Sequence, residues 1–539
     1  MREKVLIVTG GLITSQENSI REVGKKIFFQ WKNSKAAWLD RKVKITMAEP
    51  LFAFYLEQFY SFFSSKKIPG LLKKQNWHPP SLTEVILATL LQKEGIEFES
   101  MEIGLLFSNP KKANYLIQNT GCVFLSTTYL HDLSELEPIV KRFKQKHNKI
   151  VLGGALTSIL YKTWKGMAEV DLVAVGYGEL LLPSIANWIK SNFTSLQTLP
   201  YTNLIHRQHS MFLISQTPES RNLDFLETPN WSLFEQNFNT IYYESVRGCP
   251  YRCSFCNYPY LFNDKTFRFK SAKRIADDWE YYSKELGITN IICLDSLFTI
   301  PRERLLEFCK ILIQKKLPIK WTCYARADDL AKEEIVSLMK ESGASQVQIG
   351  IESGDATILK NMNKACNIET NHQALINCRK HKLTTAASLI IGYPGETNQT
   401  IQNTYNFLEK TPPDFYFLAL FSTRIPNVPI LNPENKKRFS LKVNENQYSM
   451  APYWKHSTMF CLEATNHLRR LDFELMQNKV SLNSVLFYKT MSEFHFGDRG
   501  WMLDLQKRVA NHTILRMIFD AINLWVDKKL QQDLDVHLS

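Results

Sequence analysis

The stretch Arg247-Gly248-Cys249-Pro250-Tyr251-Arg252-Cys253-Ser254-Phe255-Cys256 places three cysteines in a CxxxCxxC spacing directly after an expected strand. Three thiolates on one short loop can hold three irons of a [4Fe–4S] cluster and leave the fourth iron open to a small molecule. A structural zinc site would need a fourth protein ligand, and the next histidine along the chain is His372. The loop therefore predicts an iron–sulfur site, both metal-binding and catalytic, at Cys249, Cys253 and Cys256.

Downstream of this loop, short apolar runs alternate regularly with helical patterns. Six strands are expected, at 242–245, 289–294, 320–324, 346–351, 386–391 and 415–421. Five helices are expected between them, at 272–286, 302–315, 331–342, 369–381 and 397–410. Strands that alternate with helices form parallel sheets. The segment 241–425 is therefore predicted to be a partial (βα)6 barrel, with the cysteine loop after its first strand.

The segment upstream of the loop shows a second alternating set. Strands are expected at 4–12, 97–104, 122–126, 150–154 and 171–175, with helices that begin after Ser81 and Asp132. Glycines and hydroxyl residues follow several of these strands, which is typical of a doubly wound, Rossmann-like α/β sheet that binds a ligand beyond its strand ends. Residues 1–190 are predicted to form this domain, with an insertion over 13–75 that shows no clear period.

Two further regions complete the expected organisation. Residues 191–240 hold Pro200, Pro218 and Pro229 among polar stretches, and they are predicted to be a linker between the two domains. Residues 426–539 have helical character and several aromatic side chains, and they are predicted to form a mainly helical C-terminal region.

The cysteine loop resembles the signature of the radical S-adenosylmethionine (SAM) superfamily, including the aromatic residue before the third cysteine. Four more stretches resemble that superfamily in the same order: LDS at 294–296, YARAD at 324–328, GIESG at 350–354 and IGYPGET at 391–397. The resemblance implies that the cluster chelates SAM and breaks it down to a deoxyadenosyl radical. It implies SAM contacts from Phe255, Gly392 and Tyr393 at the adenine, Asp295 and Ser296 at the amino group, Arg326 at the carboxylate, and Glu352 and Ser353 at the ribose.

The segment 77–190 resembles the cobalamin-binding domain that precedes many radical SAM barrels. The matching pieces are FLSTT at 124–128, VLGG at 151–154 and VGYGE at 175–179. The resemblance implies cobalamin contacts from Ser126, Thr127, Gly153, Gly154, Gly176, Gly178 and Glu179. The Asp-x-His-x-x-Gly motif of cobalamin-dependent mutases is missing from the sequence, so cobalamin is expected without a protein histidine below the cobalt. A domain that has lost cobalamin binding is the alternative.

Together the resemblances imply a cobalamin-dependent radical SAM methyltransferase that methylates an unactivated carbon or phosphorus centre of a small molecule. The stretches NYP at 257–259 and PYWKHSTM at 452–459 resemble, more loosely, enzymes that methylate phosphorus. The second of them is expected either to meet substrate or to pack against the barrel.

Three other functions are weighed against this one. A radical rearrangement or cyclisation without methyl transfer uses the same barrel motifs. A methylthiotransferase acting on RNA uses a further three-cysteine cluster upstream, whereas only Cys122 precedes Cys249 here. A binding scaffold without catalysis does not explain the five barrel motifs.

Bulk composition narrows the class further. Hydrophobic residues make up 44% of the chain and charged residues 22%, which is typical of a globular protein. The net charge of +13 is dispersed along the chain, so it favours a lysine-rich surface over a nucleic-acid partner. No signal peptide or membrane-spanning stretch is recognised. A cytoplasmic location, a small-molecule substrate and a reductant such as flavodoxin or ferredoxin are expected.

Overall fold

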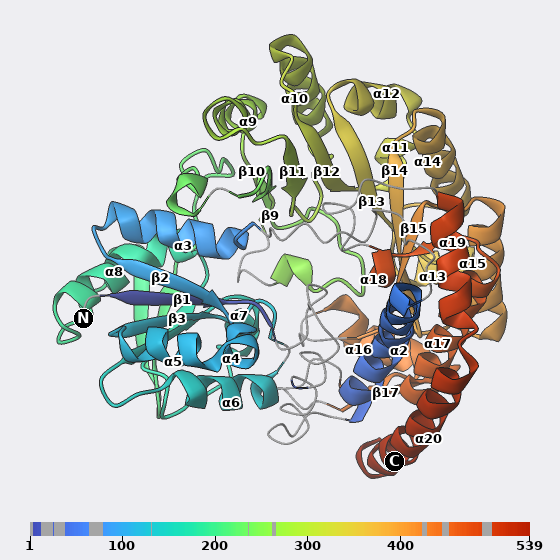
Figure 1. Cartoon of the computed structure of the whole chain (residues 1–539), viewed down its shortest axis with the longest axis horizontal. Coiled ribbons are helices and arrows are strands. Elements are labelled where there is room, and N and C mark those ends of the chain that lie inside the picture. The colour runs from blue at the N-terminus through green and yellow to red at the C-terminus, as the bar shows by residue number, and fades with distance from the viewer. Residues whose placement is uncertain are drawn as a thin grey trace.

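The computed structural model describes residues 4–11, 25, 38–63, 79–130, 132–235, 237–260, 266–422, 428–444, 452–487 and 499–538. Two large sheets dominate this α/β chain, and Figure 1 shows the first on the left and the second at the top and right. Much of the predicted insertion 13–75 lies outside the described residues. The predicted fold class is confirmed.

The first sheet belongs to a doubly wound domain. Its strands lie in the order β2-β1-β3-β4-β5-β7-β6, and all neighbours are parallel except the β6–β7 pair. The bounds are β1 Val5–Thr9, β2 Phe98–Glu102, β3 Cys122–Ser126, β4 Lys149–Gly153, β5 Leu172–Val175, β6 Thr202–His206 and β7 Met211–Ser215. The strand order reverses between β1 and β3, and doubly wound sheets bind ligands at the carboxyl ends of the strands near such a reversal.

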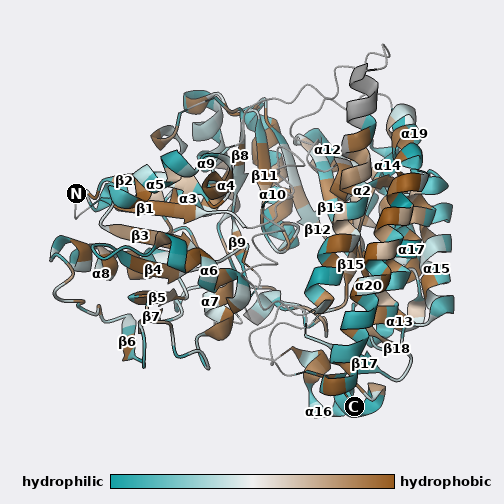
Figure 2. Cartoon of the chain, turned by 60° about the horizontal axis from the view of Figure 1, so that its bottom comes forward, coloured by the Kyte–Doolittle hydropathy of each residue, from teal (hydrophilic) through white to brown (hydrophobic). Residues whose placement is uncertain are grey.

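Helices cover both faces of this sheet. One face carries α5 (Pro110–Gln118), α6 (Leu133–Phe143) and α7 (Ala155–Leu160), and the other carries α3 (Leu82–Lys93) and α8 (Gly178–Lys190). Figure 2 shows apolar residues along the strands between them. The expected caps are present, because the amide of Glu84 donates to Ser81 Oγ at 3.3 Å and the amide of Glu135 donates to Asp132 at 3.1 Å.

The segment predicted as a linker contributes two strands instead. β6 and β7 form an antiparallel hairpin, and β7 pairs in parallel with β5, so residues 202–215 extend the first sheet. The prolines at 200, 218 and 229 flank this hairpin and the segment after it rather than interrupting a strand. Only the remainder, from 216 to 239, connects the sheet to the next domain.

The second sheet is the predicted partial barrel. Its order is β19-β15-β14-β13-β12-β11-β8, and every neighbouring pair is parallel. The bounds are β8 Thr240–Tyr243, β11 Asn290–Cys293, β12 Lys320–Ala325, β13 Ala344–Glu352, β14 Thr384–Ile391, β15 Phe415–Leu420 and β19 Leu482–Asn483. The outer helices are α9 Ala272–Leu286, α10 Arg302–Lys315, α11 Ala327–Leu330, α12 Glu333–Glu341, α13 Ala356–Asn361, α14 Ile368–Lys380 and α15 Asn398–Lys410. All six predicted strands are present, and β8 begins two residues earlier than expected.

The C-terminal region is helical, as predicted, but it also holds a helix from the start of the chain. α17 (Cys461–Gln477), α19 (Arg499–Ala510) and α20 (Thr513–His537) pack around α2 (Trp38–Phe63), as Figure 1 shows. The rings of Trp38 and Trp525 lie 5.1 Å apart, and Arg469 pairs with Glu49 at 2.7 Å. The sequence placed α2 in the N-terminal domain, as part of residues 1–190, and that assignment is corrected. The apolar side chains of α2 join the core of the C-terminal helices.

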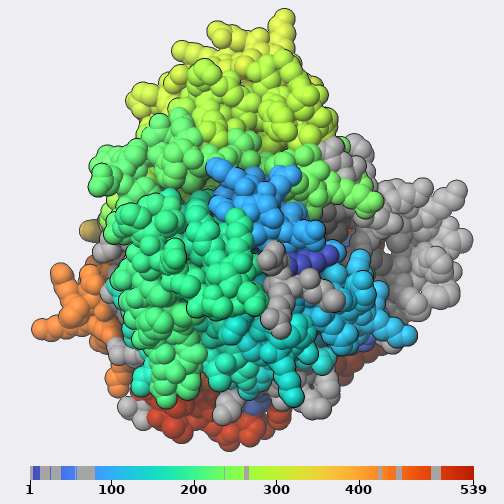
Figure 3. Space-filling model, turned by 90° about the vertical axis from the view of Figure 1, so that its left-hand side faces the viewer, coloured from blue at the N-terminus to red at the C-terminus, as the bar shows by residue number. Residues whose placement is uncertain are grey.

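Figure 3 views the molecule from the side of the N-terminal domain, which covers that face below the barrel helices. None of the helices in the described parts of the chain combines the length and the apolar content needed to cross a bilayer.

Candidate active site

The cysteine loop leaves the barrel through a short hairpin. β9 (Val246–Arg247) pairs with β10 (Arg268–Phe269), and the loop begins at Gly248. Gly248 has a φ of +81°, and a side chain there would collide with the carbonyl oxygen of Thr266, so only glycine fits. The hydroxyl of Ser296, at the end of β11, donates to the Gly248 carbonyl at 2.7 Å. Ser296 therefore fixes the start of the loop.

The middle of the loop is held by Ser254, which lies between the second and third cysteines. Its amide donates to the Met362 carbonyl at 2.9 Å, and its carbonyl accepts from the amide of Ile430 at 2.9 Å. Its hydroxyl lies 2.6 Å from the hydroxyl of Tyr393. Tyr393, expected at the adenine, is fully buried, so its direct partner is the loop. Phe255 is half-buried, and its ring meets that of Tyr393 edge-on at 6.4 Å.

The three thiols are half-buried neighbours. Burial raises the pKa of Cys249 and raises the pKa of Cys256 to about 12, and the nearby Cys253 thiolate raises both further. Within the described ranges, no three histidine, cysteine or acidic side chains converge on one metal ion. In a cubane cluster each cysteine holds its own iron, so its sulfur atoms need not converge on a single point. Three adjacent thiols that have no disulfide partner fit such a cluster.

Two cations, Arg326 and Lys364, lie beside the thiols. Burial still raises the pKa of Cys249, and the two positive charges offset part of that increase. Arg326 lies 3.7 Å above the Tyr251 ring, and its guanidinium donates to Asp328 at 2.8 Å and to the Ala365 carbonyl at 3.0 Å. Lys364 pairs with Glu352 at 2.8 Å. Either cation suits the carboxylate of SAM. The role of Lys364 was not predicted, although it lies in the stretch that follows the fourth barrel strand.

Two residues expected to contact SAM are structural in this geometry. Asp295 is fully buried and accepts from the amides of Ser245 at 2.6 Å and Val246 at 2.7 Å, and from the Ser245 hydroxyl at 2.6 Å. Ser353 is also fully buried, and its hydroxyl accepts from the amide of Asp355 at 3.1 Å. Both side chains stabilise the turns that follow their strands.

The segment 452–459 packs beneath Gly392 rather than facing open space. Gly392 has a φ of +88°, and a side chain there would meet Trp454 at 2.8 Å and Ala464 at 2.7 Å. The rings of Trp454 and His456 stack at 5.2 Å, and His456 Nε2 lies 3.3 Å from the Gly392 carbonyl oxygen. Burial lowers the pKa of His456 to about 4, so the ring is neutral at pH 7 and can donate there through one tautomer.

The loops predicted to bind cobalamin meet at the carboxyl ends of the first sheet. Thr127 donates through its amide at 2.7 Å and its hydroxyl at 2.8 Å to the Gly153 carbonyl. Gly154, with a φ of +105°, has no room for a side chain, because Thr128 Oγ1 would lie 2.8 Å from it. The Ser126 hydroxyl donates to Thr128 Oγ1 at 3.2 Å.

The loop after β5 completes this edge. Gly176 has a φ of +102° and lies against Ser215, which accepts from the amide of Tyr177 at 2.8 Å. Gly178 begins α8, and nothing lies within 4 Å of the position where its side chain would start. Glu179, expected at the corrin, instead forms an ion pair with Arg247 at 2.6 Å.

Each set of strand ends carries a partly exposed tyrosine that the sequence did not reveal. Tyr129, after β3, is 55% exposed, and Tyr324, in β12, is 39% exposed. Burial nevertheless raises the pKa of both phenols, and Tyr129 adds to the increase at Tyr324. The two phenols therefore lie near each other, one from each domain.

The barrel and its cysteine loop match a known family. Residues 243–408, from the end of β8 to α15, match the family model described as the radical SAM superfamily. Residues 243–408 therefore form a radical SAM domain. Members of this superfamily use a [4Fe–4S] cluster and SAM, and the three neighbouring thiols lie where such a cluster would be held.

Several known proteins are similar to this chain. The anaerobic magnesium-protoporphyrin IX monomethyl ester cyclase of Rubrivivax gelatinosus is 25% identical over half of this chain and 51% of its own length. An uncharacterized methyltransferase of Pyrococcus horikoshii is 25% identical over 54% of this chain and 64% of its own. The chain thus spans about half to two-thirds of these curated relatives.

Two solved structures share the fold of this chain. The radical SAM methyltransferase TsrM of Kitasatospora setae superposes with a TM-score of 0.54 at 16% identity, over 70% of this chain and 78% of its own. The cobalamin-dependent radical SAM enzyme OxsB superposes with a TM-score of 0.54 at 15% identity, over 85% of this chain and 78% of its own. The combination of a doubly wound domain and a partial barrel is therefore shared with both.

One buried acid beside the cysteine loop's partner Tyr393 gives a pH-dependent prediction. Glu396 accepts from the Gly392 amide, its second oxygen has no hydrogen-bond partner among the described residues, and burial raises its pKa to about 8. A raised carboxyl pKa means that the folded state binds the proton more tightly than the unfolded chain, so stability falls as pH rises from about 4.5 through 8. Glu396→Gln removes this term. The free energy of unfolding of Glu396→Gln, measured by urea unfolding relative to the wild type, should rise by about 1 kcal/mol as the pH increases from 7 to 9. A difference that stays constant over this range would contradict the assignment.

Proposed function

We propose that this chain is a cobalamin-dependent radical SAM methyltransferase that methylates an unactivated carbon or phosphorus centre of a small molecule. One observation carries the proposal: the loop after β5, at the carboxyl end of the doubly wound sheet, meets the barrel beside the cysteine loop, where Glu179 pairs with Arg247 at 2.6 Å. The shared fold with TsrM and OxsB, whose structures are described with bound cobalamin, supports it.

The proposal assigns a role to each group of residues. Cys249, Cys253 and Cys256 each hold one iron of the cluster, and Arg326 and Lys364 bind the SAM carboxylate. The loops at 126–128, 153–154 and 176–178 hold cobalamin, without a histidine from the mutase motif. When bound, these groups supply reductive cleavage of SAM and transfer of a methyl group.

The chain's own contribution is to position the reactants and to exclude water. The side chains of Leu294, Tyr324 and Tyr129 are partly exposed near the carboxyl ends of β11, β12 and β3. Apolar and aromatic side chains beside the reacting groups limit side reactions of a radical with solvent. We expect electrons from a donor such as flavodoxin or ferredoxin.

The test is an anaerobic reconstitution of the whole chain with iron, sulfide and cobalamin. After desalting, the visible spectrum is recorded, and SAM is added with dithionite. Corrin bands retained with the protein, together with deoxyadenosine and S-adenosylhomocysteine, would support a methyltransferase. Cluster absorption without any deoxyadenosine would contradict the proposal.

A second candidate is radical cyclisation or rearrangement without methyl transfer, and the similarity to the protoporphyrin ester cyclase favours it. The same experiment separates the two. Deoxyadenosine without S-adenosylhomocysteine or methylated product, measured over a panel of candidate substrates, would favour this second function.

Cobalamin binding gives a prediction at Gly178. No described residue lies within 4 Å of the position where its side chain would start, so Gly178→Leu should fold normally and add bulk at the start of α8, beside the loops proposed to hold cobalamin. We expect about 10-fold weaker retention of cobalamin, since even 1.4 kcal/mol of overlap costs a factor of ten. Ala356→Leu, an exposed first residue of α13 in the barrel, is the matched control and should retain cobalamin like the wild type. Equal retention by both variants would argue against a corrin at this edge.

A further inference from the structure

Arg247 lies two residues before the first cysteine of the loop and is buried between two domains. On the barrel side, its guanidinium donates to Glu244 at 2.8 and 3.0 Å. On the other side, two of its nitrogens donate to the two oxygens of Glu179, at 2.6 and 3.1 Å. Glu179 lies in the first turn of α8, in the N-terminal domain. The ring of Tyr177, just before α8, lies 5.0 Å from the same guanidinium.

The ion pair between Arg247 and Glu179 is both strong and specific. The side chains of Arg247 and Glu179 are 7% and 13% exposed, so water competes little for their hydrogen bonds. A bidentate arginine–carboxylate pair also fixes the relative orientation of its two partners. Burial by itself would raise the pKa of Glu179, but the charge of Arg247 outweighs burial and lowers it.

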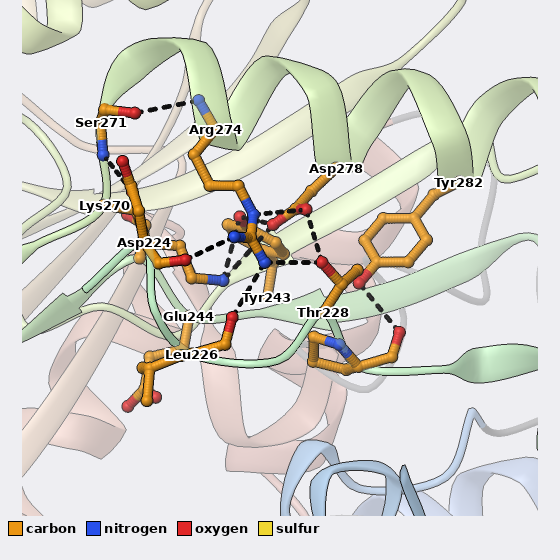
Figure 4. A network of polar contacts seen from close by, with 12 residues as sticks. Asp224, Leu226, Thr228, Tyr243, Glu244, Lys270, Ser271, Arg274, Asp278 and Tyr282 are labelled. Atoms are coloured by element: carbon orange, nitrogen blue, oxygen red, sulfur yellow. Dashed lines mark hydrogen bonds and ion pairs between the residues drawn. The ribbon is translucent and has the colours of Figure 1, made fainter. Parts of the chain in front are cut away.

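On the barrel side, a network of polar contacts around Asp278 holds the strand that precedes Glu244, as Figure 4 shows. Glu244 follows Tyr243, whose hydroxyl donates to Asp278 of α9 at 2.6 Å. Arg274 donates to the same Asp278 at 2.9 Å and to Thr228 at 2.7 Å. This network ties β8, α9 and the connecting segment into one unit. Of the two acids that pair with Arg247, Glu244 therefore stays with the barrel. Glu179 belongs to the N-terminal domain and moves with it.

We propose that Arg247 is a positioning residue for the cysteine loop, and that Glu179 makes the loop's conformation depend on the docking of the N-terminal domain. The consequence is that the cluster site is fully ordered only while the domain that faces it is in place. This inference rests on the proposed cluster site, and it adds a coupling between the two domains.

The test measures the loop directly, in the whole chain without cofactors. Amide hydrogen exchange is followed in peptides that cover 246–257 for the wild type and for Glu179→Gln, which removes the charge and keeps the shape. We expect at least about 10-fold faster exchange in these peptides, and unchanged exchange in peptides from β3 and β13. The matched control is Glu227→Gln, because Glu227 pairs with Lys93 of the same N-terminal domain across an exposed contact.

Three outcomes decide the question. Faster exchange in 246–257 for Glu179→Gln alone supports the proposal. Wild-type exchange in that segment, or an equal response in Glu227→Gln, overturns it. If Glu179→Gln does not fold, Glu179→Asp replaces it, since the shorter acid keeps the charge but not the bidentate geometry. Because this readout needs neither SAM nor cobalamin, a failure of the proposed methyltransferase function would appear separately, as a wild-type protein that forms no deoxyadenosine.

Discussion

Cys253→Ala should lose the iron–sulfur absorption band after reconstitution and form deoxyadenosine from SAM more than about 100-fold more slowly than the wild type. The reason is that a cubane cluster held by three thiolates has no spare protein ligand, and even the loss of a partner outside the ligand set commonly costs 10–100-fold in metal affinity or activity. The measurements are iron content per chain, the visible spectrum and the rate of deoxyadenosine formation.

Cys366→Ala is the control for this prediction. Cys366 is a half-buried free thiol outside the loop, in a region whose charges also act on the loop thiols. Its replacement should leave iron content near that of the wild type. If Cys253→Ala kept its iron, or if both variants lost it equally, the assignment of the loop cysteines as the cluster ligands would be wrong.

Asp295→Ala should lower the free energy of unfolding by about 3–5 kcal/mol at pH 7.5. The substitution leaves the buried amides of Ser245 and Val246 without their acceptor, and it removes the negative charge nearest to the buried Arg304. Urea unfolding followed by circular dichroism would measure the loss. Burial raises the pKa of Asp295 to about 6, so the comparison belongs above that pH, where the carboxylate is ionised.

Two companion variants make the result specific. Asp295→Asn keeps one carbonyl oxygen that can face the two amides, and it should recover more than half of the loss. Asp277→Ala, at an exposed position of α9, should change stability by less than about 0.5 kcal/mol. A large loss of SAM binding in Asp295→Asn with wild-type stability would instead return Asp295 to the role expected from the family resemblance.

The elements of the fold were predictable because their signals are local. The six barrel strands are short apolar runs bounded by turns, and the CxxxCxxC loop is contiguous in the sequence. The β6–β7 hairpin was missed because its strands are short and stand among polar residues and prolines. α2 was misplaced because its partners, α17, α19 and α20, lie some 400 residues downstream, where no local pattern points to them.

The site was harder to predict than the fold for a related reason. Sequence motifs indicate which strand ends carry polar residues, but not whether each side chain points into the cavity or into the protein. Asp295 and Ser353 point inward and hold turns, whereas Arg326 lies beside the thiols. Glu179 was assigned to a cofactor, since nothing in the sequence shows that its charge is matched by Arg247, 68 residues away.

The packing of α2 against α20 has a consequence for how the protein is made. A ribosome completes α20 about 470 residues after it completes α2. At typical translation rates that interval is on the order of tens of seconds. Until α17, α19 and α20 have all emerged, the apolar side chains of α2 that enter the C-terminal core, such as Ile45 and Phe54, lack the complete native surface that covers them. The nascent chain is therefore expected to depend on a holding chaperone, and that dependence should end when α20 emerges.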